Sequence, residues 1–396
     1  MILNALGKKN ISDEKLLQLI EQANHLTQGG YNDWDNNAET LTPVLQKILL
    51  RSREVQDWQA YFYTMSRLQW YVLRSGVNQP SIAFQIAELF HQDYQQHIGE
   101  NISRFAGEFR VNIAAEILDF YACYPQIDDA KLTQMLEIYR DCAARFGSNW
   151  NNGDYTALMT LALLHKDQAM AEEAAERLQH VPYQNWCYIC TYVWPMLGYY
   201  VLEDDFESAK TLALQAAKRQ IPVKYQWCYQ KCQQADEKSL LGRILQCCMK
   251  LGNAEQFHQF FQEWKWIYQD PQEREIDETY DELFHALAGE WSHLEKQLAL
   301  AQQDDRKRRD QRDTPLDSLY WSLCWFCFFQ LLERNGVEHV HLELDEAREW
   351  SCKEAAAYFE RQADEIGAQM DRARARFGYA DRKNGYIACI LEGATE

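Results

Sequence analysis

Two pairs of cysteines in the middle of the chain have the spacing of metal ligands. Cys187 and Cys190 form a Cys-x-x-Cys pair, and Cys228 and Cys232 form a Cys-x-x-x-Cys pair. Four thiolates in two such pairs suit the tetrahedral coordination of Zn²⁺, and short-spaced pairs at helix ends can converge on one ion. An all-thiolate site is closed to substrate, so zinc at these residues would be structural and not catalytic.

The same cysteines also fit an interpretation as buried free thiols. Trp186, Ile189 and Trp227 surround them with apolar side chains, and cysteine in such surroundings is often an inert small core residue. The chain has 12 cysteines, which dilutes the significance of any one pair. The residues therefore favour free thiols without a cofactor, and structural zinc at the two pairs is the alternative.

Other patterns that carry chemistry are weak or missing. His339, His341 and Glu343 alternate, so an extended segment would place all three on one side, but without a second ligand cluster they indicate a short connector. The sequence has no H-E-x-x-H pair, phosphate-binding loop, nucleophile elbow or dinucleotide glycine fingerprint. We therefore predict a protein that is not an enzyme.

Helices must position these residues, because helical periodicity of apolar residues runs through most of the chain. The chain has only 17 Gly and 8 Pro, which is few for an all-β protein. Interruptions occur at 78–80, at Gly99 and at 124–125, and the segments between them are long and amphipathic. Long helices with short connections predict antiparallel hairpins and an all-α fold.

From about Asp154 onward, one layout recurs: an apolar helix, a tight polar break and a second helix. Four segments share it, at 158–178, 194–216, 243–264 and 282–302. Aligned at their breaks, they place these residues at one equivalent position: Ala171, Ala209, Phe257 and Leu294. A helical hairpin repeated at intervals of roughly 40 residues predicts an α-solenoid, in which each hairpin buries its apolar face against its neighbours.

These hairpins resemble tetratricopeptide repeats. The best example is Gly198-Tyr199-Tyr200, followed by the acidic break at 203–205 and by the small residues Ala209 and Ala213 in the second helix. Phe257 departs from the family pattern, which expects a small residue there. The resemblance covers roughly residues 150–300. Together with the periodicity and charge of the flanking segments, it predicts four regions: N-terminal helical hairpins at 1–150, tetratricopeptide-like repeats at 151–303, a charged loop at 304–315 and a C-terminal helical capping region at 316–396.

A loop motif occurs twice in the chain. Ala-Arg-Phe-Gly at 144–147 precedes Asn152-Gly153, and Ala-Arg-Phe-Gly at 375–378 precedes Asn384-Gly385; in both we expect Asn-Gly to begin the next helix. This motif looks like that of bacterial tetratricopeptide-like proteins found beside polymorphic toxin genes. Those proteins also carry a Cys-x-x-Cys pair ahead of such a hairpin and a further Cys after it. The resemblance implies an immunity protein.

The charge of the chain points to a basic partner. The 40 Lys and Arg against 59 Asp and Glu give a net charge of −19, which disfavours direct nucleic-acid binding and favours a basic protein or peptide. Loop aromatics beside carboxylates are the candidate contacts: Tyr31, Asp33, Trp34, Asp35, Trp150 and Asp154. The apolar stretch at 319–332 is too short to cross a membrane, and the first residues lack a secretory signal, so we expect a cytoplasmic location.

Together, these patterns predict a non-catalytic α-solenoid that binds another protein. Its specific form is a bacterial immunity protein that neutralises a toxin by masking a basic domain, with acidic side chains steering association and aromatic side chains anchoring it. One alternative is a peptide-sensing tetratricopeptide-like regulator or scaffold. A second alternative is an enzyme with no recognisable motif.

Overall fold

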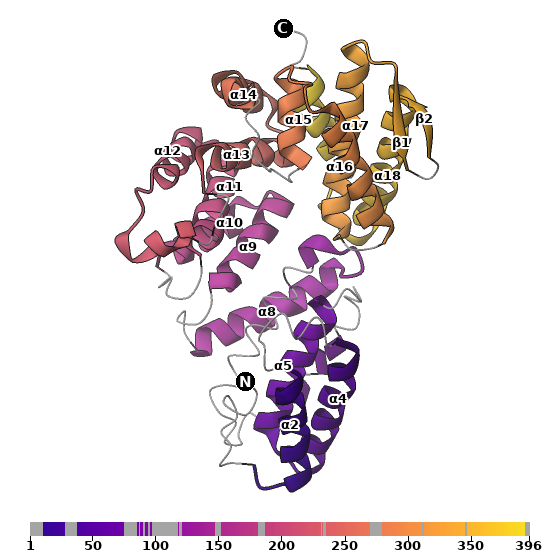
Figure 1. The fold of residues 1–396 in the computed structure, drawn as a ribbon. Helices are drawn as coiled ribbons and strands as arrows, with labels where there is room; N and C mark the ends of the chain where they lie inside the picture. The colour runs from indigo at the N-terminus through magenta and orange to yellow at the C-terminus, as the bar shows by residue number, and fades with distance from the viewer. Residues whose placement is uncertain are drawn as a thin grey trace. The chain divides into compact units, whose positions relative to one another are not determined.

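The structure, a computed structural model, is mostly helical and divides into two compact units (Figure 1). One unit comprises Met1–Tyr121 and Gln126–Asp154, and the other comprises Ala122–Pro125 and Tyr155–Glu396. The residues that the structure describes are 11–27, 38–74, 85–86, 88–89, 92–93, 96, 118, 121–146, 152–180, 187–230, 232, 235–269, 279–310, 313–344 and 347–392.

The first unit contains α2 (Glu14–Leu26), α4 (Ala38–Glu54), α5 (Trp58–Arg74) and α8 (Asp129–Phe146). Helices α2 and α4 pack together, and so do α4 and α5. Asp13 caps the start of α2 by accepting a hydrogen bond from the Leu16 amide at 2.7 Å, and Arg51 of α4 donates to both oxygens of the same carboxylate, at 3.1 and 2.7 Å. The Asp13 side chain thus caps the start of α2 and also links this helix to α4.

The second unit begins with a run of helical hairpins. Its elements up to residue 309 are α9 (Asn152–His165), α10 (Gln168–His180), the π-helical turn η2 (Ile189–Val193), α11 (Trp194–Leu202), α12 (Phe206–Ala217), the 3₁₀ segment η3 (Val223–Gln230), α13 (Glu237–Leu251), α14 (Ala254–Tyr268), α15 (Thr279–Leu287) and α16 (Leu294–Arg309). Helix α11 packs on α10, α12 and α13, and α13 packs on α12, α14 and α15. Each hairpin therefore shares its core with the next.

The four hairpins turn in the same way. Each break contains one residue in the left-handed region, with φ of 52°, 56°, 79° and 81° at Lys166, Asp204, Gly252 and Gly289. The amide of the following residue bonds to the carbonyl five residues earlier in every case, as in Asp167 to Ala162 at 2.9 Å. This is the Schellman end of an α-helix. The alignment made from sequence therefore corresponds to one recurring backbone turn.

The same turn also occurs in the first unit, where sequence analysis did not place a repeat. Gln56 between α4 and α5 has φ of 57°, and the Asp57 amide bonds to the Ser52 carbonyl at 2.9 Å. Asp57 then caps α5 by accepting from the Ala60 amide at 3.0 Å, as Asp167 does for Met170 at 3.1 Å in the second unit.

The C-terminal part contains α17 (Pro315–Arg334), β1 (His339–Glu343), β2 (Ala347–Ser351), α18 (Cys352–Ala373), α19 (Tyr379–Ile387) and the π-helical turn η4 (Ala388–Glu392). The apolar stretch at 319–332 is the buried part of α17, which packs along α18. None of the helices in the described ranges combines the length and the apolar character that a membrane crossing needs.

Three sequence expectations in this part are wrong. The charged segment is helical through Arg309, so the loop predicted at 304–315 begins later. The strands β1 and β2 pair antiparallel, with His339 opposite Ser351, where we expected a short connector within a helical capping region. Asn384-Gly385 lies inside α19, which starts at Tyr379 directly after Gly378. The expected helix start at Asn152-Gly153 is confirmed, because α9 begins at Asn152.

The last elements pack back onto the hairpins. Helix α19 lies against α13, and η4 lies against α14. The Nε2 atom of His258 in α14 lies 3.2 Å from the Ala388 carbonyl and 2.9 Å from the Cys389 carbonyl. Gly252 and Gly385 meet so closely that a Cβ on Gly385 would lie 2.7 Å from the Gly252 Cα.

Candidate metal centre

Non-α-helical segments on either side of the α11–α12 hairpin bring the two cysteine pairs together. The π-helical turn η2 leads into α11. Cys190 belongs to this turn, and Cys187 lies just before it. Cys228 lies in the 3₁₀ segment η3 after α12, and its carbonyl accepts a hydrogen bond from the Cys232 amide at 2.7 Å. The hairpin between them folds back on itself, so its entry and its exit are adjacent (Figure 1).

Three of the four sulfurs form a compact group. The Sγ atoms of Cys187, Cys190 and Cys232 all lie within 4.8 Å of one another, and those of Cys190 and Cys232 are 3.7 Å apart. Four sulfurs at roughly 2.3 Å from a tetrahedral Zn²⁺ lie about 3.8 Å from one another, whereas a disulfide needs about 2.05 Å. The separation therefore fits two ligands of one metal ion.

The local electrostatics favour a thiolate in this group. Hydrogen bonds from the Cys190 and Cys232 thiols lower the pKa of Cys187, and the backbone amides of Cys190 and Ile189 lower it further. The contact with Cys187 in turn raises the pKa of Cys190. Neighbouring thiols and backbone amides therefore favour a thiolate at Cys187, the form in which cysteine binds a metal ion.

Cys228 lies beside this group, on its buried side. Its Sγ accepts a hydrogen bond from the Tyr188 amide at 3.1 Å, and its side chain contacts the Cys187 thiol. Burial raises the pKa of Cys228, which is fully buried, whereas the other three cysteines are half-buried. Cys228 is not one of the three sulfurs that all lie within 4.8 Å of one another, so it is the candidate for a fourth ligand beside that group.

Stacked tyrosines form the wall next to the cysteines. The Tyr188 ring stacks on Tyr225 at a centroid distance of 4.6 Å and on Tyr192 at 4.7 Å. Sequence analysis read the aromatic neighbours only as an apolar setting for the thiols. Two tyrosines lie within two residues of Cys187 or Cys190 in the sequence, and this proximity was the available signal that they would line the same site.

The other cysteine and histidine candidates do not form such a group. Cys324 and Cys327 are buried in α17, where desolvation raises the pKa of both thiols. His339 and His341 are both exposed on β1, so they share one side of a strand where we expected a connector. Within the described ranges, the group whose ligand atoms lie close enough together to hold one metal ion consists of Cys187, Cys190 and Cys232.

The residues proposed for partner contact lie largely outside the described residues. This holds for Tyr31, Asp33, Trp34, Asp35 and Trp150. Asp154 belongs to α9, but its side chain is also outside the described part of the structure. These six contacts stay predictions from sequence.

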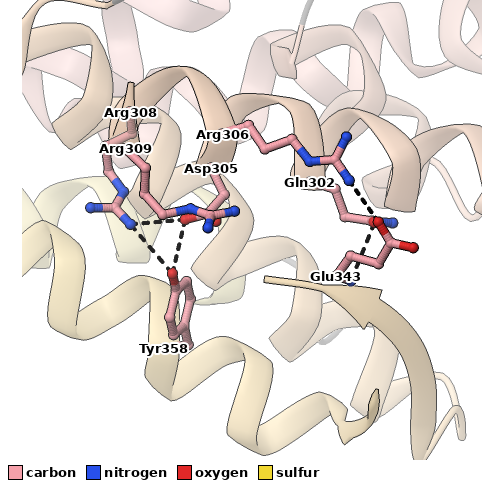
Figure 2. A network of polar contacts seen from close by, with 7 residues as sticks. All are labelled: Gln302, Asp305, Arg306, Arg308, Arg309, Glu343 and Tyr358. Atoms are coloured by element: carbon pink, nitrogen blue, oxygen red, sulfur yellow. Dashed lines mark hydrogen bonds and ion pairs between the residues drawn. The ribbon is translucent and has the colours of Figure 1, made fainter. Parts of the chain in front are cut away.

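The basic run at 306–309 is paired within the protein (Figure 2). Arg308 and Arg309 bind the buried carboxylate of Asp305 at 2.9 and 2.8 Å. Arg306 reaches Glu343 of β1 at 2.6 Å. Because carboxylates neutralise these guanidinium groups, the run is not a free basic patch for an acidic partner.

No protein family matches the chain, and the comparisons with characterised proteins and with solved structures also found no match.

Proposed function

We propose that this chain is a non-catalytic, helical-hairpin binding protein that holds a structural Zn²⁺ at Cys187, Cys190, Cys228 and Cys232. The convergence of three sulfurs within 4.8 Å, from segments on both sides of one hairpin, is the observation that carries the zinc assignment. Sequence reasoning alone favoured free thiols. The distance between Cys190 and Cys232 shifts the balance toward a metal site.

Zinc bound there would join the segment that enters α11 to the segment that leaves α12. Neither η2 nor η3 is a regular α-helix, so their backbones gain less from helical hydrogen bonding than the flanking helices do. A metal bound only to the folded chain stabilises it through linkage. The site supplies no open coordination position for catalysis when all four thiolates bind.

Metal analysis of the purified protein tests the zinc proposal. We expect about one Zn²⁺ per wild-type chain and less than about a fifth of that in Cys190→Ser and Cys232→Ser, since each removes a ligand. Cys247→Ser is the matched control, because Cys247 is also half-buried but lies on α13. Wild-type protein without zinc, or zinc retained in both ligand variants, would overturn the proposal.

The binding function rests on the helical hairpins and on charge. Four hairpins of the second unit share one turn, and such repeats stack into extended surfaces that bind proteins. The net charge of −19 attracts a basic partner, and the densest basic run is neutralised internally. We propose an α-solenoid with tetratricopeptide-like hairpins, acting as an immunity protein that masks a basic toxin domain in the bacterial cytoplasm.

Affinity capture from the native cell at low salt tests the binding proposal. A single basic protein, retained in stoichiometric amount and released as salt is raised, is the expected result, because screening weakens charge-steered association. Addition of the chain to that purified partner should suppress the partner's toxic activity. A retained partner that is acidic, or binding that is indifferent to salt, would contradict the charge-masking mechanism.

A further inference from the structure

A cavity of about 180 Å³ lies in the second unit, between α9, α13, α17 and α19. One face of α13 supplies its polar side, with Arg243, Gln246 and Lys250 at spacings of three and four residues. Side chains at this spacing lie on the same face of a helix. Leucines of α9, α13 and α17 supply the apolar side.

Three of the side chains that line the cavity are cationic: Arg243, Lys250 and Arg382. No Asp or Glu occurs among the described residues that line it. In the described part of the chain, neither Arg243 nor Lys250 forms an ion pair with a carboxylate. This concentration of positive charge is unexpected in a chain with a net charge of −19.

Aromatic rings hold the two α13 cations in place of counter-ions. The Lys250 Nζ lies 5.0 Å from the centre of the Tyr320 ring and 5.5 Å from that of Tyr280, and Arg243 lies 4.9 Å above the Trp194 ring. Cation–π contacts orient a cation but leave its donors available. Burial, and then the nearby Arg243, lower the pKa of Lys250, whereas Asp317 of α17 raises it in part.

Arg382 also lines the cavity, and hydrogen bonds to backbone carbonyls hold its side chain in place. It is buried, and its Nε donates to the Phe377 carbonyl at 2.5 Å while its Nη2 donates to the Leu164 carbonyl of α9. These bonds use two of its five donors. The close contact of Gly252 with Gly385 brings α19 near enough to α13 for Arg382 to reach the cavity.

We propose that this cavity binds a small organic anion. A phosphate or carboxylate group accepts charge-assisted hydrogen bonds from Arg243 and Lys250, which are half-buried at the cavity. The apolar body of the ligand lies against Leu163, Leu164 and Leu316. The volume corresponds to about six water molecules, which suits a compact metabolite. This inference is independent of the zinc site and of the protein partner.

Calorimetric titration with phenyl phosphate and with benzoate tests the proposal, since the two probes share an apolar body and differ in the anionic group. We expect saturable binding of at least one probe. We expect roughly tenfold or more weaker binding in Arg243→Gln and Lys250→Met, because each removes a charged donor. Lys353→Met, which removes an exposed lysine of α18, is the control and should bind as the wild type does.

The melting temperature of each variant separates loss of the anion site from loss of the fold. Lys250→Met replaces a half-buried charge that forms no ion pair in the described part of the chain with an apolar side chain of similar length, so we expect it to melt no lower than the wild type without ligand. Binding of phenyl phosphate alone assigns a phosphate ligand, and binding of benzoate assigns a carboxylate. No saturable binding of either probe at about 10 mM, or equal affinity in both cavity variants, would refute the anion site.

Discussion

Tyr358 of α18 donates a hydrogen bond of 2.9 Å to the Oδ1 atom of Asp305, which lies in the last turns of α16 and is 1% exposed. Arg308 donates to the same carboxylate oxygen and also lies 3.3 Å from the Tyr358 hydroxyl, as Figure 2 shows. Arg309 binds Oδ2 at 2.8 Å. The carboxylate thus joins two helices that are far apart in the sequence.

We expect Asp305→Asn to lower the free energy of unfolding by about 3 kcal/mol, because it leaves two guanidinium groups beside a neutral amide in a buried site. Glu343→Gln is the matched control, since its ion pair with Arg306 is 53% to 58% exposed and worth less than about 1 kcal/mol. Urea unfolding of both variants measures the difference. Equal losses would show that the Asp305 network is no stronger than a surface pair.

Gly385→Ala should lower the free energy of unfolding by about 2 kcal/mol or more, because its Cβ would meet the Gly252 backbone, which cannot rotate away. Gly289→Ala separates this effect from backbone strain: Gly289 has φ of 81° and open space around it, so about 1 kcal/mol is expected. Thermal unfolding followed by circular dichroism compares them. A smaller loss in Gly385→Ala than in Gly289→Ala would contradict the close helix contact.

His285 should make the protein sensitive to mild acid. Desolvation first, and then Lys238, lower its pKa from 6.5 to about 4, so the folded chain keeps the ring neutral while the unfolded chain takes up a proton near pH 6.5. Stability is therefore lost as pH falls from 6.5 toward 4, by up to about 3 kcal/mol, and this site adds no further loss below that range.

The variant His285→Gln should flatten this part of the pH–stability curve, since glutamine can still donate to the Tyr268 carbonyl and accept from Lys238 but does not titrate. His339→Gln removes an exposed histidine and should leave the curve unchanged. Urea midpoints between pH 7 and pH 4 provide the measurement. An unchanged curve in His285→Gln would assign the acid sensitivity to other groups.

Removal of zinc by a strong chelator should lower the melting temperature of the wild type and change its near-ultraviolet circular dichroism, because the Tyr188–Tyr225 stack adjoins the cysteines. Cys190→Ser, which we expect to lack the metal already, should show neither change when the chelator is added. Cys228→Ser tests the fourth ligand: weaker zinc retention is expected there, whereas retention equal to the wild type would limit the protein ligands to three.

Local signals explain why the hairpins could be predicted from sequence. The break before each second helix has a left-handed residue and a following Schellman bond, and such turns depend on a few neighbouring residues. The spacing of Cys187 with Cys190, and of Cys228 with Cys232, was equally local. The convergence of the two cysteine pairs across the hairpin is not a local property. It depends on the packing of α11 against α12, which decides which cysteines lie close together.

Tertiary contacts decided the features that sequence reasoning missed. The segment 347–351 contains residues that also occur in helices, and pairing with β1 makes it a strand with Trp350 buried. Asn384-Gly385 looks like a turn, but contact with Gly252 requires glycine inside a helix. Arg243 and Lys250 were not among the residues predicted from sequence, because charge alone does not reveal which face of α13 lines a cavity.

The return of α19 and η4 onto α13 and α14 has a consequence for how the second unit folds. In a linear repeat array each hairpin contacts only its neighbours, so unfolding can begin at one end and proceed stepwise. Here contacts such as that of His258 with the Cys389 carbonyl span more than a hundred residues. Loop closure of that length raises the contact order, slows folding and makes the hairpins and the C-terminal turn melt in one transition.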